Sequence, residues 1–147
     1  MAIRQPAKVG KLLAGEQPSG DDLDVLKAQG VRSVVNLRED GERDRPSIPA
    51  EEGRQAEALG LSFVHLPVTV PELSPELVEQ FRRTVDALPG PVYVHCGLGQ
   101  RAVTLALIVD AQDTGASAED AIRDAERQGF EITPEVKTFI RTQLDRD

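Results

Sequence analysis

The fold and the candidate site both depend on residues 91–102, which have the sequence Pro91-Val92-Tyr93-Val94-His95-Cys96-Gly97-Leu98-Gly99-Gln100-Arg101-Ala102. The apolar residues at its start predict a short strand, and the apolar run that continues after Ala102 predicts a helix. The loop between them contains the only cysteine of the chain and closes on an arginine. The first turn of a helix has backbone N–H groups without intrahelical partners, so this junction is a candidate anion site.

Two residues of this loop are the candidate catalytic groups. The helix N-terminus and the neighbouring Arg101 guanidinium are both expected to favour the thiolate form of Cys96, which makes it the candidate nucleophile. Arg101 is the candidate clamp, because its planar fork binds two oxyanion atoms at once. The alternatives are a buried structural cysteine and a surface arginine paired with one of the many carboxylates of this chain.

Other residues are candidates for binding or auxiliary roles. The predicted oxyanion-binding loop consists of Gly97, Leu98, Gly99, Gln100, Arg101 and Ala102. Glycines there allow positive φ and a close approach of N–H groups to a ligand, although an ordinary tight turn is the alternative. His95 is expected to lie on the opposite face of the strand and to orient the loop by hydrogen bonding. Arg38, at a strand end, is a candidate source of positive potential, with a solvated arginine as the alternative. His65 is expected to be a satisfied core or rim histidine.

Length and composition predict one domain over residues 1–147, with its core at about 9–144. Apolar residues make up 39% of the chain and charged residues 29%, as in ordinary soluble globular proteins. No stretch approaches the roughly 20 apolar residues of a membrane span, and the N-terminus is not a secretory signal. A single cysteine cannot form an internal disulfide, so a cytoplasmic protein without membrane association is expected.

The net charge of −8 argues against nucleic-acid binding, which requires a basic face. Only two histidines and one cysteine are present, so no metal site and no cofactor are expected. A small anionic substrate or a phosphoprotein remains a suitable partner, because the potential of a site is local. The sequence leaves the oligomeric state open.

Hydrophobic patterning predicts an α/β fold. Strands are expected at 9–15, 31–37, 61–68 and 91–95, the first of them as a short edge strand. Helices are expected at 22–29, 49–59, 75–88, 103–114, 118–128 and 134–144, and Val25 is expected to face inward in the first of them. This alternation predicts a mainly parallel sheet of four to five strands with helices on both faces.

The positions of the polar loops predict a ligand site at one edge of this sheet. Ligands of such sheets bind outside the carboxyl ends of the strands. The loops that follow Leu37, Val68 and His95 all start at that edge, and we expect them to converge on one site. The charged segment 38–46, which follows the second strand, is expected to be a surface loop.

The segment from His95 to Arg101 resembles the cysteine-dependent phosphatases of the tyrosine and dual-specificity superfamily. It is most similar to the bacterial phosphatase-like domains that occur alone or fused to β-lactamase-like hydrolases. Three further segments are typical of that bacterial group: Gln17-Pro18-Ser19, Val34-Val35-Asn36-Leu37-Arg38 with Gly41-Glu42, and His65-Leu66-Pro67-Val68. The resemblance covers about residues 9–144. It implies a phosphatase-like fold and hydrolysis through a phosphocysteine intermediate on Cys96.

The chain departs from the phosphatase pattern in three ways. Four residues separate Cys96 from Arg101, one fewer than in the superfamily, and the residue after the arginine is Ala102 rather than serine or threonine. The loop at 69–73 has no aspartate to act as general acid, so Glu72 is the substitute candidate, with plain surface glutamate as the alternative. Three hypotheses follow, in this order: an atypical or weak phosphatase, a rhodanese-type sulfurtransferase with a persulfide on Cys96, and a non-catalytic module that binds oxyanions or phosphopeptides.

Overall fold

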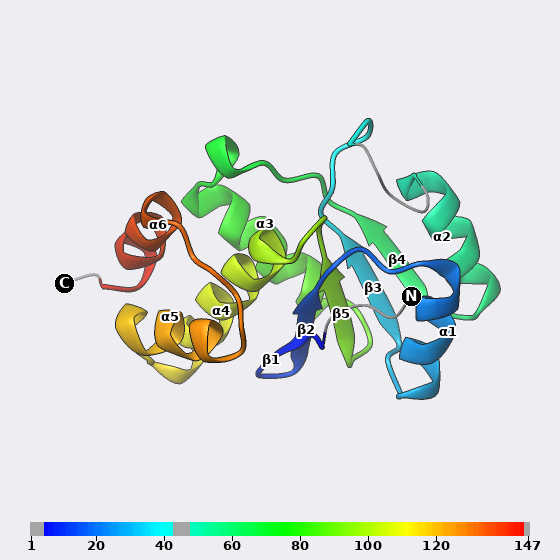
Figure 1. Cartoon of the computed structure of the whole chain (residues 1–147), viewed down its shortest axis with the longest axis horizontal. Helices are drawn as coiled ribbons and strands as arrows, with labels where there is room; N and C mark the ends of the chain where they lie inside the picture. Colours follow the sequence, from blue (N-terminus) through cyan, green and yellow to red (C-terminus); the bar gives the residue numbers. More distant parts are fainter. Residues whose placement is uncertain (1–4, 43–47, 146–147) are drawn as a thin grey trace.

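A computed structural model describes residues 5–42 and 48–145 as an α/β fold around a five-stranded sheet (Figure 1). The strands are β1 (Ala7–Val9), β2 (Leu12–Gly15), β3 (Ser33–Asn36), β4 (Ser62–His65) and β5 (Val92–His95), and their order in the sheet is β1-β2-β5-β3-β4. β1 pairs antiparallel with β2, and all other neighbours are parallel. The helices are α1 (Gly20–Ala28), α2 (Pro49–Ala58), α3 (Pro75–Asp86), α4 (Gln100–Thr114), α5 (Ala118–Arg127) and α6 (Pro134–Leu144), with a 3₁₀ turn η1 (Val70–Glu72). The predicted α/β fold with a mainly parallel sheet is confirmed.

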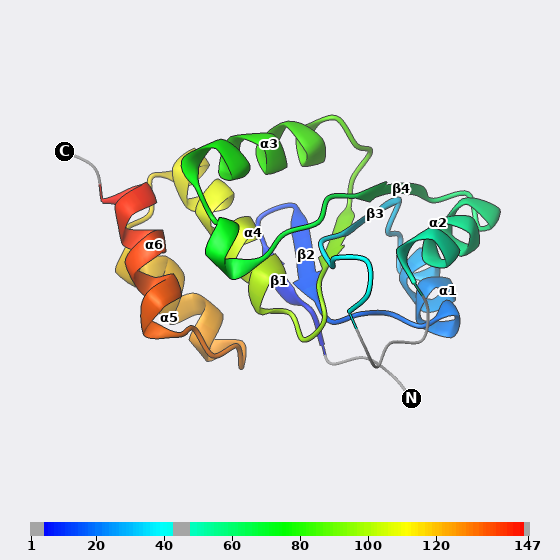
Figure 2. The same ribbon diagram turned by 90° about the horizontal axis from the view of Figure 1, so that it is seen from above.

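Helices cover both faces of the sheet, and the alternation of residues along each strand decides which face they meet. α1 and α2 lie on one face, and α3 to α6 lie on the other (Figures 1 and 2). Val34 of β3 and Tyr93 of β5 are buried with residues of α1 and α2. Val35 and Val94, their immediate neighbours in sequence, are buried in the larger cluster around α4. Successive side chains of a strand point to opposite faces, so one apolar run serves both layers.

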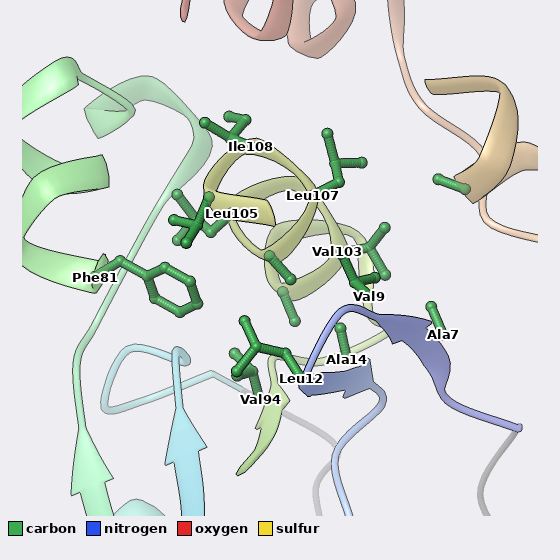
Figure 3. Close-up of a cluster of buried hydrophobic side chains, with 14 of the residues drawn as sticks. Ala7, Val9, Leu12, Ala14, Phe81, Val94, Val103, Leu105, Leu107 and Ile108 are labelled. Carbon is green, nitrogen blue, oxygen red and sulfur yellow. The ribbon is translucent and has the colours of Figure 1, made fainter. Parts of the chain in front are cut away.

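α4 is the central helix of the larger layer. Val103, Leu105 and Ile108 point to different sides of it and are all completely buried (Figure 3). Phe81 of α3 packs beside the helix, and Leu12 of β2 lies between the helix and the sheet (Figure 3). A helix that is apolar on all sides requires a protein partner on every side. Because α4 begins at the candidate site, its burial fixes the position of that site.

Two predicted features at the N-terminal end differ from the structure. The segment 9–15 is not an edge strand but parts of two strands, and β2 lies inside the sheet between β1 and β5. Gly10 has φ +59°, which allows the tight turn that joins these strands. Val25 does not face inward but is 53% exposed, because α1 turns Leu23 and Leu26 toward the core instead.

The charged segment that follows β3 is only partly a surface loop. Arg38, at its start, is 1% exposed, so its interpretation as a solvated arginine is wrong. The Arg38 side chain is buried because it bonds to protein groups of the site described below. Residues 43–47 of the segment lie outside the described residues. No helix in the described part of the chain is long and apolar enough to cross a membrane.

Candidate active site

Cys96 lies at the junction between β5 and α4, as predicted. Gly99 is the N-cap of α4, with φ +108°, and its N–H donates a hydrogen bond to Sγ of Cys96 at 3.2 Å. The cysteine is 1% exposed. Its sulfur therefore lies beside the N-terminal end of a buried helix, where a negative charge is favoured.

The carbonyl groups of the loop are held by partners outside it. The Cys96 carbonyl faces Nδ1 of His95 at 3.2 Å, and the Gly97 carbonyl accepts from the backbone N–H of Gln17 at 3.1 Å. In a trans peptide the C=O and N–H groups point in opposite directions. The N–H groups of Gly97 and Leu98 thus point away from these partners, and consecutive N–H groups of this kind form an anion-binding concavity.

The loop requires glycine at position 99, and we expect Gly99→Ala to destabilise the fold. Gly99 has a positive φ, which is strained for any residue with a side chain. A Cβ atom at this position would also lie 2.7 Å from Cε1 of Phe130. The matched control is Gly115→Ala, since Gly115 has φ +79° with nothing within 4 Å of the added atom. We expect the positive φ alone to lower the free energy of unfolding by about 1–2 kcal/mol in either variant. The collision with Phe130 lowers it by about 1–3 kcal/mol more in Gly99→Ala. Urea unfolding of both variants measures this difference. Equal losses of unfolding free energy in the two variants would contradict the predicted collision with Phe130.

Arg101 is half-buried and is held by the loops that follow two other strands. Its Nη1 and Nη2 donate to the Glu42 carboxylate at 2.8 and 3.0 Å, and Nη1 also donates to the Val68 carbonyl at 2.9 Å. The three loops that follow β3, β4 and β5 therefore meet at one guanidinium, which confirms the predicted convergence. The alternative was a surface arginine paired with a carboxylate. Arg101 does pair with a carboxylate, but it is half-buried where the three loops meet rather than on the surface.

The hydrogen bonds from Arg101 to Glu42 and Val68 do not use one edge of its guanidinium. An arginine has five N–H donors, and the bonds to Glu42 and Val68 use both hydrogens of Nη1 and one of Nη2. The remaining donors, Nε–H and the second hydrogen of Nη2, share one edge of the group. The pKa of Arg101 is raised above its ordinary value, first by the hydrogen bond to Glu42 and further by the nearby Cys96. The loop cysteine and Arg101 therefore interact.

Glu42 fixes the orientation of Arg101. Its carboxylate also accepts from the backbone N–H of Glu39 at 2.7 Å and from Nε of Arg38 at 3.3 Å. The hydrogen bond from Arg101 is the largest cause that lowers the pKa of Glu42 to about 2. This carboxylate therefore stays ionised, and it stays paired with Arg101, through the neutral and mildly acidic range.

This low pKa predicts an acid-dependent loss of stability. The folded-state pKa of about 2 lies below the ordinary value of 4.5, so the folded state binds the proton less readily than the unfolded chain. The contribution of the pair is fully present above the unfolded value and is lost as the pH falls toward the folded value. We expect Glu42→Gln to reduce this acid sensitivity, as measured by urea unfolding at several pH values between 2 and 6. If the free energy of unfolding depended on pH identically in the wild type and in Glu42→Gln, the lowered pKa of Glu42 would be wrong.

A buried polar network lies behind the loop. Glu52 of α2 accepts from Nε2 of Gln17 at 2.5 Å and pairs with Nε2 of His95 at 2.5 Å. Gln17 in turn accepts from Nη1 of Arg38 at 2.8 Å through its side-chain carbonyl. Because Arg38 also contacts Glu42, the network reaches from the Cys96 side of the site to Arg101.

The structure places the remaining candidates as follows. Glu72 is exposed and accepts a hydrogen bond from Oγ1 of Thr69 at 2.8 Å, so it belongs to the surface of its loop. Ala102 is buried at the start of α4, whereas Leu98 is 60% exposed at the tip of the loop. His65 pairs with the Arg38 carbonyl, in agreement with a satisfied rim histidine.

Three residues of the site were not predicted from the sequence: Gln17, Glu42 and Glu52. The first two stand in segments typical of the bacterial group, which is the signal that could have found them. Glu52 has no such signal, since it follows Glu51 in an acidic helix start.

Comparison with known families identifies the chain. A family model described as the phosphatase-like domain of beta-lactamase hydrolase-like proteins matches residues 10–113. The chain belongs to this family. A beta-lactamase hydrolase-like protein of Agrobacterium fabrum is 30% identical over 122 residues. Those residues are 83% of this chain and 28% of that protein, so this phosphatase-like domain spans little more than a quarter of its relative.

Solved structures share the fold of this phosphatase-like domain. The Neisseria meningitidis protein nma1982 has a TM-score of 0.79 at 23% identity, covering 90% of this chain and 92% of that chain. TpbA of P. aeruginosa has a TM-score of 0.73 at 18% identity, covering 89% and 79%. These likenesses show the fold, and the family match confirms the predicted resemblance to the bacterial phosphatase-like domains.

Proposed function

We propose that this domain is a cysteine-dependent phosphatase that hydrolyses a phosphoester through a phosphocysteine on Cys96. The observation that carries the proposal is the arrangement of Arg101. Glu42 and the Val68 carbonyl hold this guanidinium beside Cys96, and its Nε–Nη2 edge is the one proposed to bind two phosphoryl oxygens. The Gly99 N–H at the start of α4 contacts the attacking sulfur. A small phosphoester and a phosphoprotein are both suitable substrates.

The proposed reaction has two displacements at phosphorus. Sγ of Cys96 forms a bond to phosphorus while the ester P–O bond breaks, and the leaving oxygen takes a proton. Water then attacks phosphorus and loses a proton to solvent, the S–P bond breaks, and phosphate and the thiolate are released. The loop at 69–73 supplies no aspartate, and Glu72 bonds to Thr69 at the surface. In this proposal water donates the proton, and we expect slow turnover with a preference for aryl phosphates, which have good leaving groups.

A sulfurtransferase is the second candidate, favoured by the short loop and by the enclosed thiol. Only four residues separate Cys96 from Arg101, and the cysteine is 1% exposed. In this reaction Sγ attacks the outer sulfur of thiosulfate, the S–S bond breaks and sulfite leaves. Cyanide then takes the terminal sulfur as thiocyanate and restores the thiolate. Neither step requires a general acid.

The mass of the Cys96 adduct distinguishes these functions. The protein is incubated with an aryl phosphate, or with thiosulfate and cyanide, then acid-quenched and analysed by mass spectrometry. A phosphoryl group on Cys96, together with phosphate release, supports the proposal. One added sulfur with thiocyanate formation and no phosphate release would overturn it in favour of sulfur transfer. Binding of phosphate with neither adduct would overturn both and leave the third hypothesis, a non-catalytic oxyanion- or phosphopeptide-binding module.

A further inference from the structure

Phe130 packs against the glycine that begins α4. A Cβ atom at Gly99 would lie 2.7 Å from Cε1 of Phe130 and 3.4 Å from the carbonyl carbon of Gly15. Phe130 is 1% exposed, and Gly15 is the last residue of β2. Protein interiors are packed as densely as organic crystals, so buried groups in contact limit one another's movement. The start of α4 is therefore confined by an aromatic ring and by the end of a strand.

The end of α5 fixes the place of this ring. The C-cap residue of α5 is Gln128, and Gly129 follows it with φ +94°, which turns the chain back. The N–H of Gly129 donates to the Glu126 carbonyl at 3.0 Å, and the N–H of Phe130 donates to the Ala125 carbonyl at 3.1 Å. These bonds tie the backbone of Phe130 to the last turn of the helix.

Gln128 fastens the same segment to the edge of the sheet. Its Oε1 accepts from the backbone N–H of Lys8 at 2.9 Å, and its Nε2 donates to the Lys8 carbonyl at 3.3 Å. Lys8 belongs to β1, the edge strand, so this one side-chain amide pairs with both backbone groups of a residue as a neighbouring strand would. The segment that carries Phe130 is therefore held by α5 and by β1.

Gly99 connects this ring to the candidate nucleophile. Its N–H donates to Sγ of Cys96 at 3.2 Å, and its carbonyl accepts from the N–H of Val103 at 2.9 Å in the first turn of α4. We propose that Phe130 is a positioning residue for Cys96: its ring, held through Gln128, keeps Gly99 where the Gly99 N–H reaches the sulfur. This inference rests on the proposed role of Cys96 as nucleophile and is independent of the group that is transferred.

Two substitutions of the same kind separate this role from ordinary packing. In Phe130→Leu an apolar side chain remains, but the ring edge that meets Gly99 is removed. Phe81→Leu is the matched control, because Phe81 is completely buried in the same hydrophobic cluster and packs beside α4 from α3 (Figure 3). Both variants lose part of a buried ring, so we expect similar decreases in the urea midpoint of unfolding.

The experiment measures the hydrogen exchange of the Gly99 backbone amide by NMR in the folded protein. A general loss of stability affects this rate similarly in both variants, whereas local loosening of the loop affects it only where the loop has lost its support. We expect Gly99 to exchange about tenfold faster in Phe130→Leu than in Phe81→Leu, as for the weakening of one hydrogen bond. Equal Gly99 exchange rates in the two variants would overturn the proposal.

A milder variant keeps the inference testable if Phe130→Leu does not fold. Gln128→Ala removes the two exposed hydrogen bonds to Lys8 and leaves the ring of Phe130 unchanged. The control is Gln112→Ala, which removes an exposed hydrogen bond made by a glutamine of α4. Gly99 exchange should be faster than wild type in Gln128→Ala and unchanged in Gln112→Ala. A wild-type rate in Gln128→Ala would contradict the proposal.

Turnover of an aryl phosphate tests the connection to function. We expect kcat to fall by about tenfold or more in Phe130→Leu, because small displacements of reacting groups are costly, and to stay at the wild-type value in Phe81→Leu. A wild-type kcat in Phe130→Leu would overturn the positioning role. An inactive wild-type protein would instead contradict the proposed function, and the Gly99 exchange rates, which require no substrate, would then decide the inference.

Discussion

Replacing Cys96 with serine is expected to abolish phosphate release, with a loss of at least about 10³-fold in kcat. A serine hydroxyl is a much weaker nucleophile than a thiolate unless a neighbouring base removes its proton. Here the adjacent histidine is already engaged, since both nitrogens of His95 face the Glu52 carboxylate and a backbone carbonyl. The measurement is kcat for an aryl phosphate in wild type and in Cys96→Ser.

The same variant should still fold and bind phosphate. Serine is slightly smaller than cysteine, and the loop N–H groups and Arg101 are unchanged by the substitution. Urea unfolding and phosphate binding by calorimetry are the controls, and we expect both to remain close to wild type. Phosphate release at the wild-type rate in a folded Cys96→Ser protein would contradict nucleophilic catalysis by this residue.

Replacing Arg101 with lysine should lower kcat/KM for the same substrate by about 10²–10³-fold, the usual cost of removing a donor that stabilises transition-state charge. Arg101 binds Glu42 and Val68 with three hydrogens, and one further edge is proposed to bind the oxyanion. A lysine ammonium has three hydrogens in total and no planar fork. It can satisfy the protein partners or the ligand, but not both.

The matched control for this prediction is Arg141→Lys. Arg141 lies on α6 and donates to Glu119 at 2.7 Å in an exposed pair, which contributes little to stability. We expect wild-type kcat/KM and stability in this variant. If Arg101→Lys also retained the wild-type kcat/KM, the clamp role of Arg101 would be wrong.

The sequence was sufficient for the fold because its signals are local. The apolar runs at β3 and β5 and the glycines after the helices predict elements within a few residues of their observed ends. The β1–β2 hairpin was not predicted as such, since its strands have three and four residues. Strands this short show too little alternation to be separated from one another by pattern alone.

Only part of the site could be predicted, because sequence patterns indicate contacts between residues that are close in the chain. Cys96 and Arg101 stand in one short loop, where spacing alone points to an anion site. Their supporting carboxylates are distant in sequence: Glu42 is 59 residues from Arg101, and Glu52 is 43 residues from His95. Before folding, Glu52 cannot be distinguished from its surface neighbour Glu51, because only tertiary structure separates the two.

Gln17 links the geometry around Cys96 to the completion of folding. Its backbone N–H holds the Gly97 carbonyl, and its side chain joins Glu52 to Arg38. The segments that carry these residues are brought together only in the native fold. A nascent or damaged chain therefore has the cysteine but not the loop geometry around it, so the arrangement proposed to serve the nucleophile forms only when folding is complete.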